Sequence, residues 1–198
     1  NGYIIPIGDW IIDEGIQQLQ FWQQHDILKS LTLSLNISAV QFQESGFVQK
    51  LKRKIEQSKI DYSRLILELT ESSLINNIDD TVKRINELRA LGIRLSIDDF
   101  GTGYSSLSYL KRFKLAQLKI DRMFVRDILT DQDDLTLVKT IINMGKNLGL
   151  DVVAEGVENQ QQFEVLRNAG CAKFQGYWIN KPIPGEQITA LVSSKNQR

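Results

Sequence analysis

The stretch IRLSIDDFGTGYSSLSYL, residues 93–110, decides how the rest of the chain is interpreted. Apolar and polar residues alternate up to Ile97, as they do in a β-strand. Two adjacent carboxylates, Asp98 and Asp99, end the strand, and a glycine loop and a helical pattern follow. Adjacent carboxylates repel each other unless a cation or solvent screens them. The stretch therefore predicts a strand, an acidic turn and a helix, and the turn is either an exposed helix cap or a cation site.

The glycines of this loop favour the second alternative, because glycine permits positive φ and close approach of a ligand to the backbone. The triplet DFG also occurs in protein kinases. No glycine-rich nucleotide strand, VAIK-like lysine strand or HRD loop accompanies it in this sequence. The sequence therefore excludes a protein kinase.

Length and composition are those of one ordinary globular domain. The chain has 198 residues, and 24 Lys and Arg residues balance 24 Asp and Glu residues. Zero net charge gives no bulk attraction to DNA or to an anionic membrane, so we expect no DNA partner. Cys171 is the single cysteine, which excludes an internal disulfide and indicates a reducing, cytoplasmic location. His25 is the single histidine, so a metal would have oxygen ligands, which favours magnesium or manganese.

Strand-like and helix-like patterns alternate six times along the chain. We expect strands at 32–38, 65–70, 93–99, 116–121, 151–155 and 173–177. We expect helices at 7–24, 47–57, 79–91, 105–113, 135–148 and 159–168, and a short helix near the end of the chain. Strict alternation indicates an α/β fold with a parallel sheet, either an open doubly wound sheet or a (β/α)₈ barrel. A barrel usually needs about 250 residues, so a barrel here would lack its first two strands.

Polar residues at the strand ends favour the barrel over the open sheet. Each of the six predicted strands carries one at or near its end: Asn36, Glu68, Asp98, Lys119, Glu155 and Gln175. In a barrel such ends meet at one mouth, whereas in an open sheet they spread along an edge.

A mouth of this composition predicts a metal centre. Four carboxylates, from Glu68, Asp98, Asp99 and Glu155, could not stay ionised together without positive charge. Together with the Asn36 amide they could hold two divalent cations that share a bridging aspartate, while Lys119 adds one more positive charge. Two such ions activate water for in-line phosphoryl displacement. Simpler interpretations remain open for some neighbours: Glu71 as a cap or loop tether, Glu158 as an acid in the first turn of a helix, and Thr102 as a residue that shapes the loop.

Six motifs then identify a family. SLNIS, LELTES, IDDFGTGYSSL, LKID, AEGVE and FQGY followed by KP occur in this order along nearly the whole chain. Together they resemble the EAL domain, the family of cyclic-di-GMP-specific phosphodiesterases of bacterial signalling. The resemblance implies a TIM-type barrel whose first element is antiparallel. It also implies hydrolysis of cyclic-di-GMP to linear pGpG with two magnesium or manganese ions, inhibited by calcium.

The resemblance also assigns roles to individual residues. The metal ligands that it implies are Asn36, Glu68, Asp98, Asp99 and Glu155. The residues that it implies for catalysis are Lys119, which orients the hydrolytic water, Glu155, and Glu71, which holds the DDFGTG loop. Gln175 corresponds to the glutamine of the substrate pocket, and Thr102, Asp121 and Glu158 are the supporting residues.

One feature of the family is absent from the chain, namely the Glu-Ala-Leu triplet that names it. We therefore expect residues 1–198 to be a single EAL-like domain, truncated at its N-terminus, from a longer multidomain protein. The resemblance implies that the parent carries sensory or diguanylate cyclase domains and forms homodimers, whereas the sequence leaves open whether the parent is membrane-tethered. The alternative function is a catalytically impaired module that binds cyclic-di-GMP. A more remote alternative is an acid-lined barrel that abstracts protons from carbon with Lys119 as base.

Overall fold

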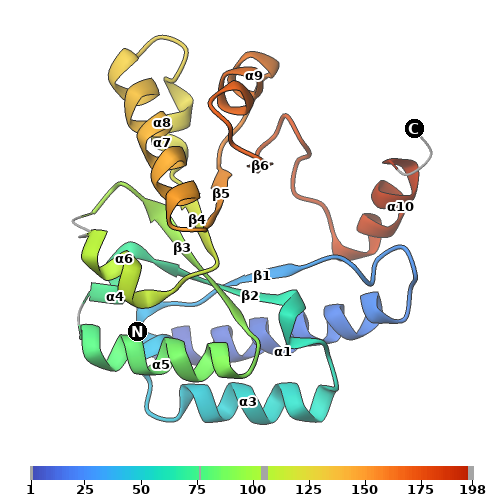
Figure 1. The fold of residues 1–198 in the computed structure, drawn as a ribbon. Helices are drawn as coiled ribbons and strands as arrows, with labels where there is room; N and C mark the ends of the chain where they lie inside the picture. The colour runs from blue at the N-terminus through green and yellow to red at the C-terminus, as the bar shows by residue number, and fades with distance from the viewer. Residues whose placement is uncertain (1, 76, 104–106, 196–198) are drawn as a thin grey trace. The chain divides into compact units, whose positions relative to one another are not determined.

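The computed structural model describes residues 2–75, 77–103 and 107–195 (Figure 1). The chain divides into two compact units. The first consists of Asn1–Glu68, Asn86–Arg94 and Pro182–Arg198, and the second of Leu69–Ile85 and Leu95–Lys181. A single domain over the whole chain stays a prediction.

The first unit contains a parallel strand pair and the helices that pack beside it. Its elements are α1 (Ile4–Gln23), β1 (Leu33–Asn36), α2 (Ala39–Gln43), α3 (Phe47–Ser58), the 3₁₀ turn η1 (Tyr62–Arg64), most of β2 (Leu65–Thr70), the end of α5 (Ile78–Ala90) and α10 (Gly185–Lys195). Strands β1 and β2 are parallel, and their register sets Asn36 opposite Glu68.

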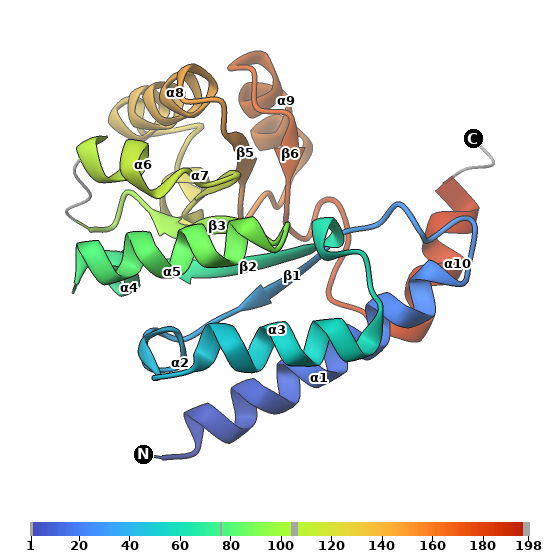
Figure 2. The same ribbon diagram turned by 60° about the horizontal axis from the view of Figure 1, so that its bottom comes forward.

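Helix α1 packs closely on β1 because it has a glycine at the contact. A Cβ atom on Gly15 would lie 2.8 Å from a methyl carbon of Leu35, so only glycine allows this approach without a shift. Two ion pairs, Asp9 with Lys50 and Asp13 with Lys54, join α1 to α3. The two helices lie side by side in both views (Figures 1 and 2).

The second unit contains the other strands, again with helices between them. Its elements are α4 (Glu71–Ile75), the start of α5, β3 (Arg94–Phe100), α6 (Leu107–Phe113), β4 (Gln117–Ile120), α7 (Arg122–Arg126), α8 (Gln132–Asn147), β5 (Asp151–Ala154), α9 (Gln160–Asn168) and β6 (Lys173–Phe174). Strand β4 pairs in parallel with β3 and β5, and β5 pairs in parallel with β6. Parallel strands joined by helices confirm the predicted α/β class.

Side-chain caps fix where the helices of the second unit begin. The Asp131 carboxylate accepts hydrogen bonds from the backbone N–H groups of Asp133 and Asp134, so α8 begins at Gln132. The apolar pattern alone placed this start at residue 135, because it does not register a polar first turn. Likewise the Asn159 side chain accepts a hydrogen bond from the Gln162 backbone and starts α9.

The remaining differences from the sequence predictions concern short elements. The strand expected at 173–177 extends only over Lys173–Phe174, and the one expected at 32–38 over Leu33–Asn36. The short helices α2, α4 and α7 were not predicted, since segments of five residues are too short for a periodic pattern. The predicted helix start at residue 105 lies outside the described residues. Among the helices that the structure describes, none has the length and apolar composition needed to cross a bilayer.

The contact of α8 with β5 yields a stability prediction. A Cβ atom on Gly145 would lie 2.3 Å from a methyl carbon of Val152, so Gly145→Ala forces the helix and strand apart. Overpacking typically costs about 1–3 kcal/mol, which exceeds the helix-propensity gain of about 1 kcal/mol. We expect a lower urea midpoint than wild type. The exposed Lys139→Ala on the same helix should leave the midpoint unchanged, and equal midpoints for all three proteins would contradict the packing.

Candidate active site and metal centre

A β-bulge in β3 forms the centre of the candidate site. Ile97 pairs with Leu118 and Phe100 with Ile120, so Asp98 and Asp99 together lie opposite the single residue between those partners, Lys119. Asp99 has a φ of 53°, in the left-handed region that aspartate tolerates better than most residues. Regular strand geometry would send two neighbouring side chains to opposite faces. The bulge instead allows both carboxylates to reach one cluster.

This acidic cluster consists of Asp98, Asp99 and Glu155. One carboxylate oxygen from each lies within 4.8 Å of the other two. The Lys119 ammonium is 3.0 Å from an oxygen of Asp98 and 2.6 Å from an oxygen of Glu155, and its side chain is 5% exposed. Lys119 therefore neutralises part of the negative charge of the cluster from within the protein.

Asp99 shows that this neutralisation is incomplete. Its pKa is raised above the ordinary value, first by burial, then by the negative charge of Asp98, and then by a hydrogen bond and charge repulsion from Asp121. The nearby Lys119 lowers this pKa by a smaller amount. The Asp121 carboxylate also accepts a hydrogen bond from the Met123 backbone at 2.7 Å, which caps α7 and fixes its position. Three carboxylates and one ammonium thus leave an excess of negative charge.

The loop after the bulge is held by Glu71. One carboxylate oxygen of this buried residue accepts hydrogen bonds from the backbone N–H groups of Gly101 at 3.3 Å and Gly103 at 3.2 Å. A Cβ atom on Gly103 would lie 2.7 Å from a carboxylate oxygen of Glu71, so any larger residue here would displace this carboxylate. The exposed Thr102 donates its hydroxyl hydrogen to the Asp99 carbonyl oxygen at 2.8 Å, which closes the turn. The loop-holding and supporting roles expected for Glu71 and Thr102 stay predictions.

The acidic cluster suits a divalent cation by its donor set. Magnesium, manganese and calcium take oxygen ligands, and carboxylates are their usual protein ligands. The cluster offers three carboxylates close together, retains excess negative charge, and contains one residue, Asp99, whose pKa is raised. A bound cation would balance the negative charge and would favour the ionised form of Asp99. Asp98, Asp99 and Glu155 are therefore residues that could hold a metal.

The other two predicted ligands belong to the first unit. Asn36 is exposed at the end of β1, and Glu68 is 6% exposed on β2 directly across from it. The register brings these two side-chain positions together, as predicted for strand ends. Their share in the metal site stays a prediction.

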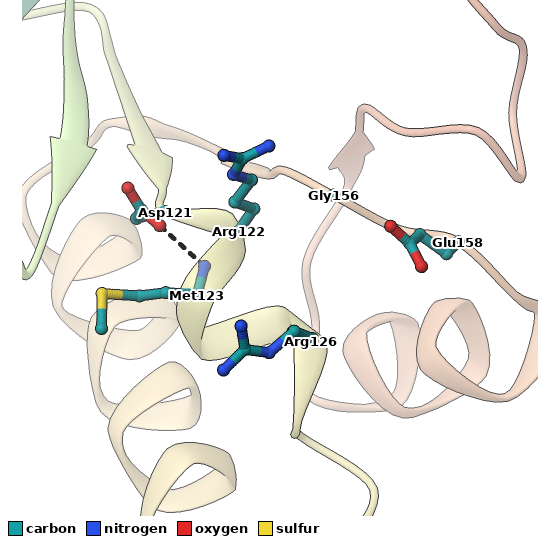
Figure 3. Close-up of a pocket in the computed structure, with 6 residues that line it drawn as sticks. All are labelled: Asp121, Arg122, Met123, Arg126, Gly156 and Glu158. Carbon is teal, nitrogen blue, oxygen red and sulfur yellow. Dashed lines mark hydrogen bonds between the residues drawn. The ribbon is translucent and has the colours of Figure 1, made fainter.

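Two cavities of the second unit adjoin the acidic cluster. One of about 370 Å³ is lined by Glu155, the predicted pocket residue Gln175 and Tyr177, among others. The second, of about 470 Å³, is lined by Asp121, Arg122, Met123, Arg126, Gly156 and Glu158 (Figure 3). Glu158 is exposed and lines both cavities. Its supporting role stays a prediction and would apply to a ligand in these cavities. Volumes of this size are typical of small-ligand sites.

Sequence reasoning missed Arg122, Gly156 and Tyr177. Arg122 and Gly156 line both cavities, and Tyr177 lines the one beside Glu155. Each directly follows or is embedded in a motif that had been singled out, LKID, AEGVE or FQGY. Position within two residues of a predicted site residue was thus the available signal.

Comparison with known proteins agrees with this geometry. The EAL domain family model matches residues 1–182. Two Pseudomonas aeruginosa proteins are each 40% identical to the chain: the bifunctional diguanylate cyclase/cyclic di-GMP phosphodiesterase MucR, over 98% of the chain, and the cyclic di-GMP phosphodiesterase NbdA, over 93%. The chain spans 28% and 23% of their lengths, about a quarter of each.

A solved structure supports the fold over the same range. The PaMucR phosphodiesterase in complex with c-di-GMP superposes with a TM-score of 0.91 at 40% identity, over 94% of this chain and 75% of that one. This likeness confirms the predicted fold, the TIM-like α/β architecture of EAL domains, present here in part. Because the family model matches residues 1–182 of the 198 residues of this chain, the chain belongs to the EAL domain family.

Proposed function

We propose that this chain is the catalytic part of a cyclic-di-GMP phosphodiesterase that hydrolyses cyclic-di-GMP to linear pGpG. The observation that carries the proposal is the acidic cluster of Asp98, Asp99 and Glu155, two of which form ion pairs with the buried Lys119. Membership of the EAL family, and similarity to the cyclic di-GMP phosphodiesterases MucR and NbdA, support cyclic-di-GMP as the proposed substrate.

The proposed metal ligands are the acidic cluster together with Asn36 and Glu68. Two magnesium or manganese ions held by these residues would activate water and stabilise the charge on the attacking and leaving oxygens. Calcium, which accepts looser geometry, would bind and inhibit.

Lys119 has two tasks in this proposal. Its ammonium holds the carboxylates of Asp98 and Glu155 in place through the contacts at 3.0 and 2.6 Å. It also orients the hydrolytic water by donating a hydrogen bond to its oxygen. The water oxygen forms a bond to phosphorus, the bond from phosphorus to the ribose 3′ oxygen breaks, and the 3′ oxygen ends protonated.

The residues around the cluster have positioning roles. Glu71 fixes the loop after the bulge through Gly101 and Gly103, and Asp121 fixes the start of α7. Gln175 and Glu158 line cavities next to Glu155 and would contact the nucleotide.

The first test is turnover by the full-length parent protein with manganese. Lys119→Ala should lower kcat by about 10²–10⁴-fold, the usual contribution of a residue that handles the proton or orients the water. Conversion of cyclic-di-GMP to pGpG is followed by chromatography. The control is Lys139→Ala, which removes an exposed lysine on α8 and should keep wild-type turnover. A parent protein that binds cyclic-di-GMP without turnover would favour the alternative, a binding module, and full activity of Lys119→Ala would refute its role.

The second test is stabilisation by metal. Since a ligand that binds the folded state raises its stability by mass action, millimolar Mn²⁺ should raise the melting temperature of the chain. Glu155→Gln should reduce the increase, because it removes one charged ligand. The control Glu164→Gln, at a half-buried position in the middle of α9, should respond as wild type does. A melting temperature independent of manganese would argue that the cluster is only an ion-pair network.

The third test is the pH dependence of the metal-free chain. Because the pKa of Asp99 is raised in the folded state, the folded state binds its proton more tightly than the unfolded state does. This contribution to stability is fully present below the unfolded pKa and is lost as pH rises through the folded pKa. Asp99→Asn should therefore stabilise the metal-free protein at neutral pH, helped by the tolerance of asparagine for positive φ.

The same Asp99→Asn variant should gain less from manganese than wild type does, because it lacks a charged ligand. Urea unfolding at pH 5 and pH 8, with EDTA or with manganese, measures both effects. A variant less stable than wild type in EDTA at pH 8 would show that Asp99 is not under electrostatic strain.

A further inference from the structure

The two cavities beside the acidic cluster share a wall that contains Arg122. Arg122, Gly156 and Glu158 line both cavities, and Glu155 of the acidic cluster lines one of them. Figure 3 shows Arg122 at the start of α7, facing the segment that carries Gly156 and Glu158. A ligand at the cluster that extends into either cavity would pass this guanidinium.

Arg122 is the available cation at this wall. Lys119 is engaged by Asp98 and Glu155, and Arg126 forms an ion pair with Asp127 at 2.8 Å. Within the part of the chain that the structure describes, the Arg122 guanidinium has neither an ion pair nor a hydrogen bond. Its charge is therefore free for a ligand.

The backbone beneath this side chain is fixed on two sides. Asp121, the preceding residue, caps α7 through the Met123 N–H group. Gly156, with a φ of 69°, passes so close that a Cβ atom on it would lie 2.6 Å from the Arg122 Cβ. Gly156 directly follows the cluster residue Glu155. The Cα and Cβ atoms of Arg122 are thus held in a fixed position next to the acidic cluster.

We propose that Arg122 binds the second phosphodiester of the cyclic dinucleotide, the one that is not being hydrolysed. The inference rests on the proposed function. The substrate has two phosphodiester anions, and the acidic cluster with its cations accounts for the one that reacts. In this proposal the other lies beside the cavity walls that carry Glu155, Glu158 and Asp121, where an unpaired anion would be repelled. A guanidinium meets a phosphodiester with two parallel hydrogen bonds, a geometry that lysine does not reproduce.

The test is calorimetric titration of cyclic-di-GMP into the full chain with calcium present, so that little substrate is consumed. Arg122→Gln should weaken binding by about 10- to 100-fold, the range for a lost hydrogen bond to a charged group. Arg122→Lys should fall between this variant and wild type. Arg53→Gln is the control, since it removes the same charge from an exposed position on α3 that lines neither cavity. It should stay within about two-fold of wild type, because solvent screens an exposed charge outside the site.

Phosphorus NMR of the saturated complexes identifies the group that Arg122 contacts. Arg122→Gln should move one of the two phosphorus resonances of the bound ligand and leave the other in place. Equal affinity of Arg122→Gln and wild type would overturn the inference alone, and so would equal losses for Arg122→Gln and Arg53→Gln. If Arg122→Gln weakened binding but moved neither phosphorus resonance, the inference would also be overturned, and a contact of Arg122 with a guanine base would be indicated instead. A wild-type chain that binds no cyclic-di-GMP would overturn the proposed function as well.

Discussion

The candidate site depends on two residues of β3 being paired against one residue of β4. Asp98 and Asp99 share the place opposite Lys119, and a regular register would have separated their carboxylates by the thickness of the sheet. The left-handed backbone at Asp99 makes this pairing possible. Such a conformation costs about 1–2 kcal/mol for an ordinary residue and less for aspartate. The site therefore depends on a local irregularity of the sheet. The regular pairing of β3 with β4 before and after the bulge must hold this irregularity in place.

The charges of the site follow from that departure. Two neighbouring carboxylates directed to one place, with Glu155 beside them, need positive charge close by. Lys119 supplies it, and its burial is tolerable because two carboxylates contact its ammonium. One ammonium does not balance three carboxylates, and the pKa of Asp99 is raised first by its burial and then by the negative charge of Asp98. The metal-free protein accordingly retains electrostatic strain where a cation would bind, a common exchange of stability for function.

Much of this could be predicted from the sequence, and the exceptions have a physical cause. Strand alternation placed β2 at 65–70, as observed, and the strand-end pattern singled out Asp98, Lys119 and Glu155 before any coordinates. The bulge was not predicted, because a pattern of period two cannot show that one extra residue is inserted in the pairing. Arg122 was missed for a related reason. An arginine that follows a helix cap looks like any solvated residue until its neighbours across the cavity are known.

The same constraint explains why glycines surround the site. Each strand end that contributes a carboxylate is followed by backbone that must pass very close to another group. Gly103 approaches the Glu71 carboxylate so closely that a Cβ atom would displace it, and Gly156 approaches Arg122 at a distance that a Cβ atom would forbid. Because of these close contacts, the groups at the cavity walls have fixed positions relative to the strands. A ligand bound at the acidic cluster would also contact these walls, so its binding depends on the position of the walls as well as on the carboxylates of the bulge. Glycine in these two loops is therefore as much a part of the site as the carboxylates.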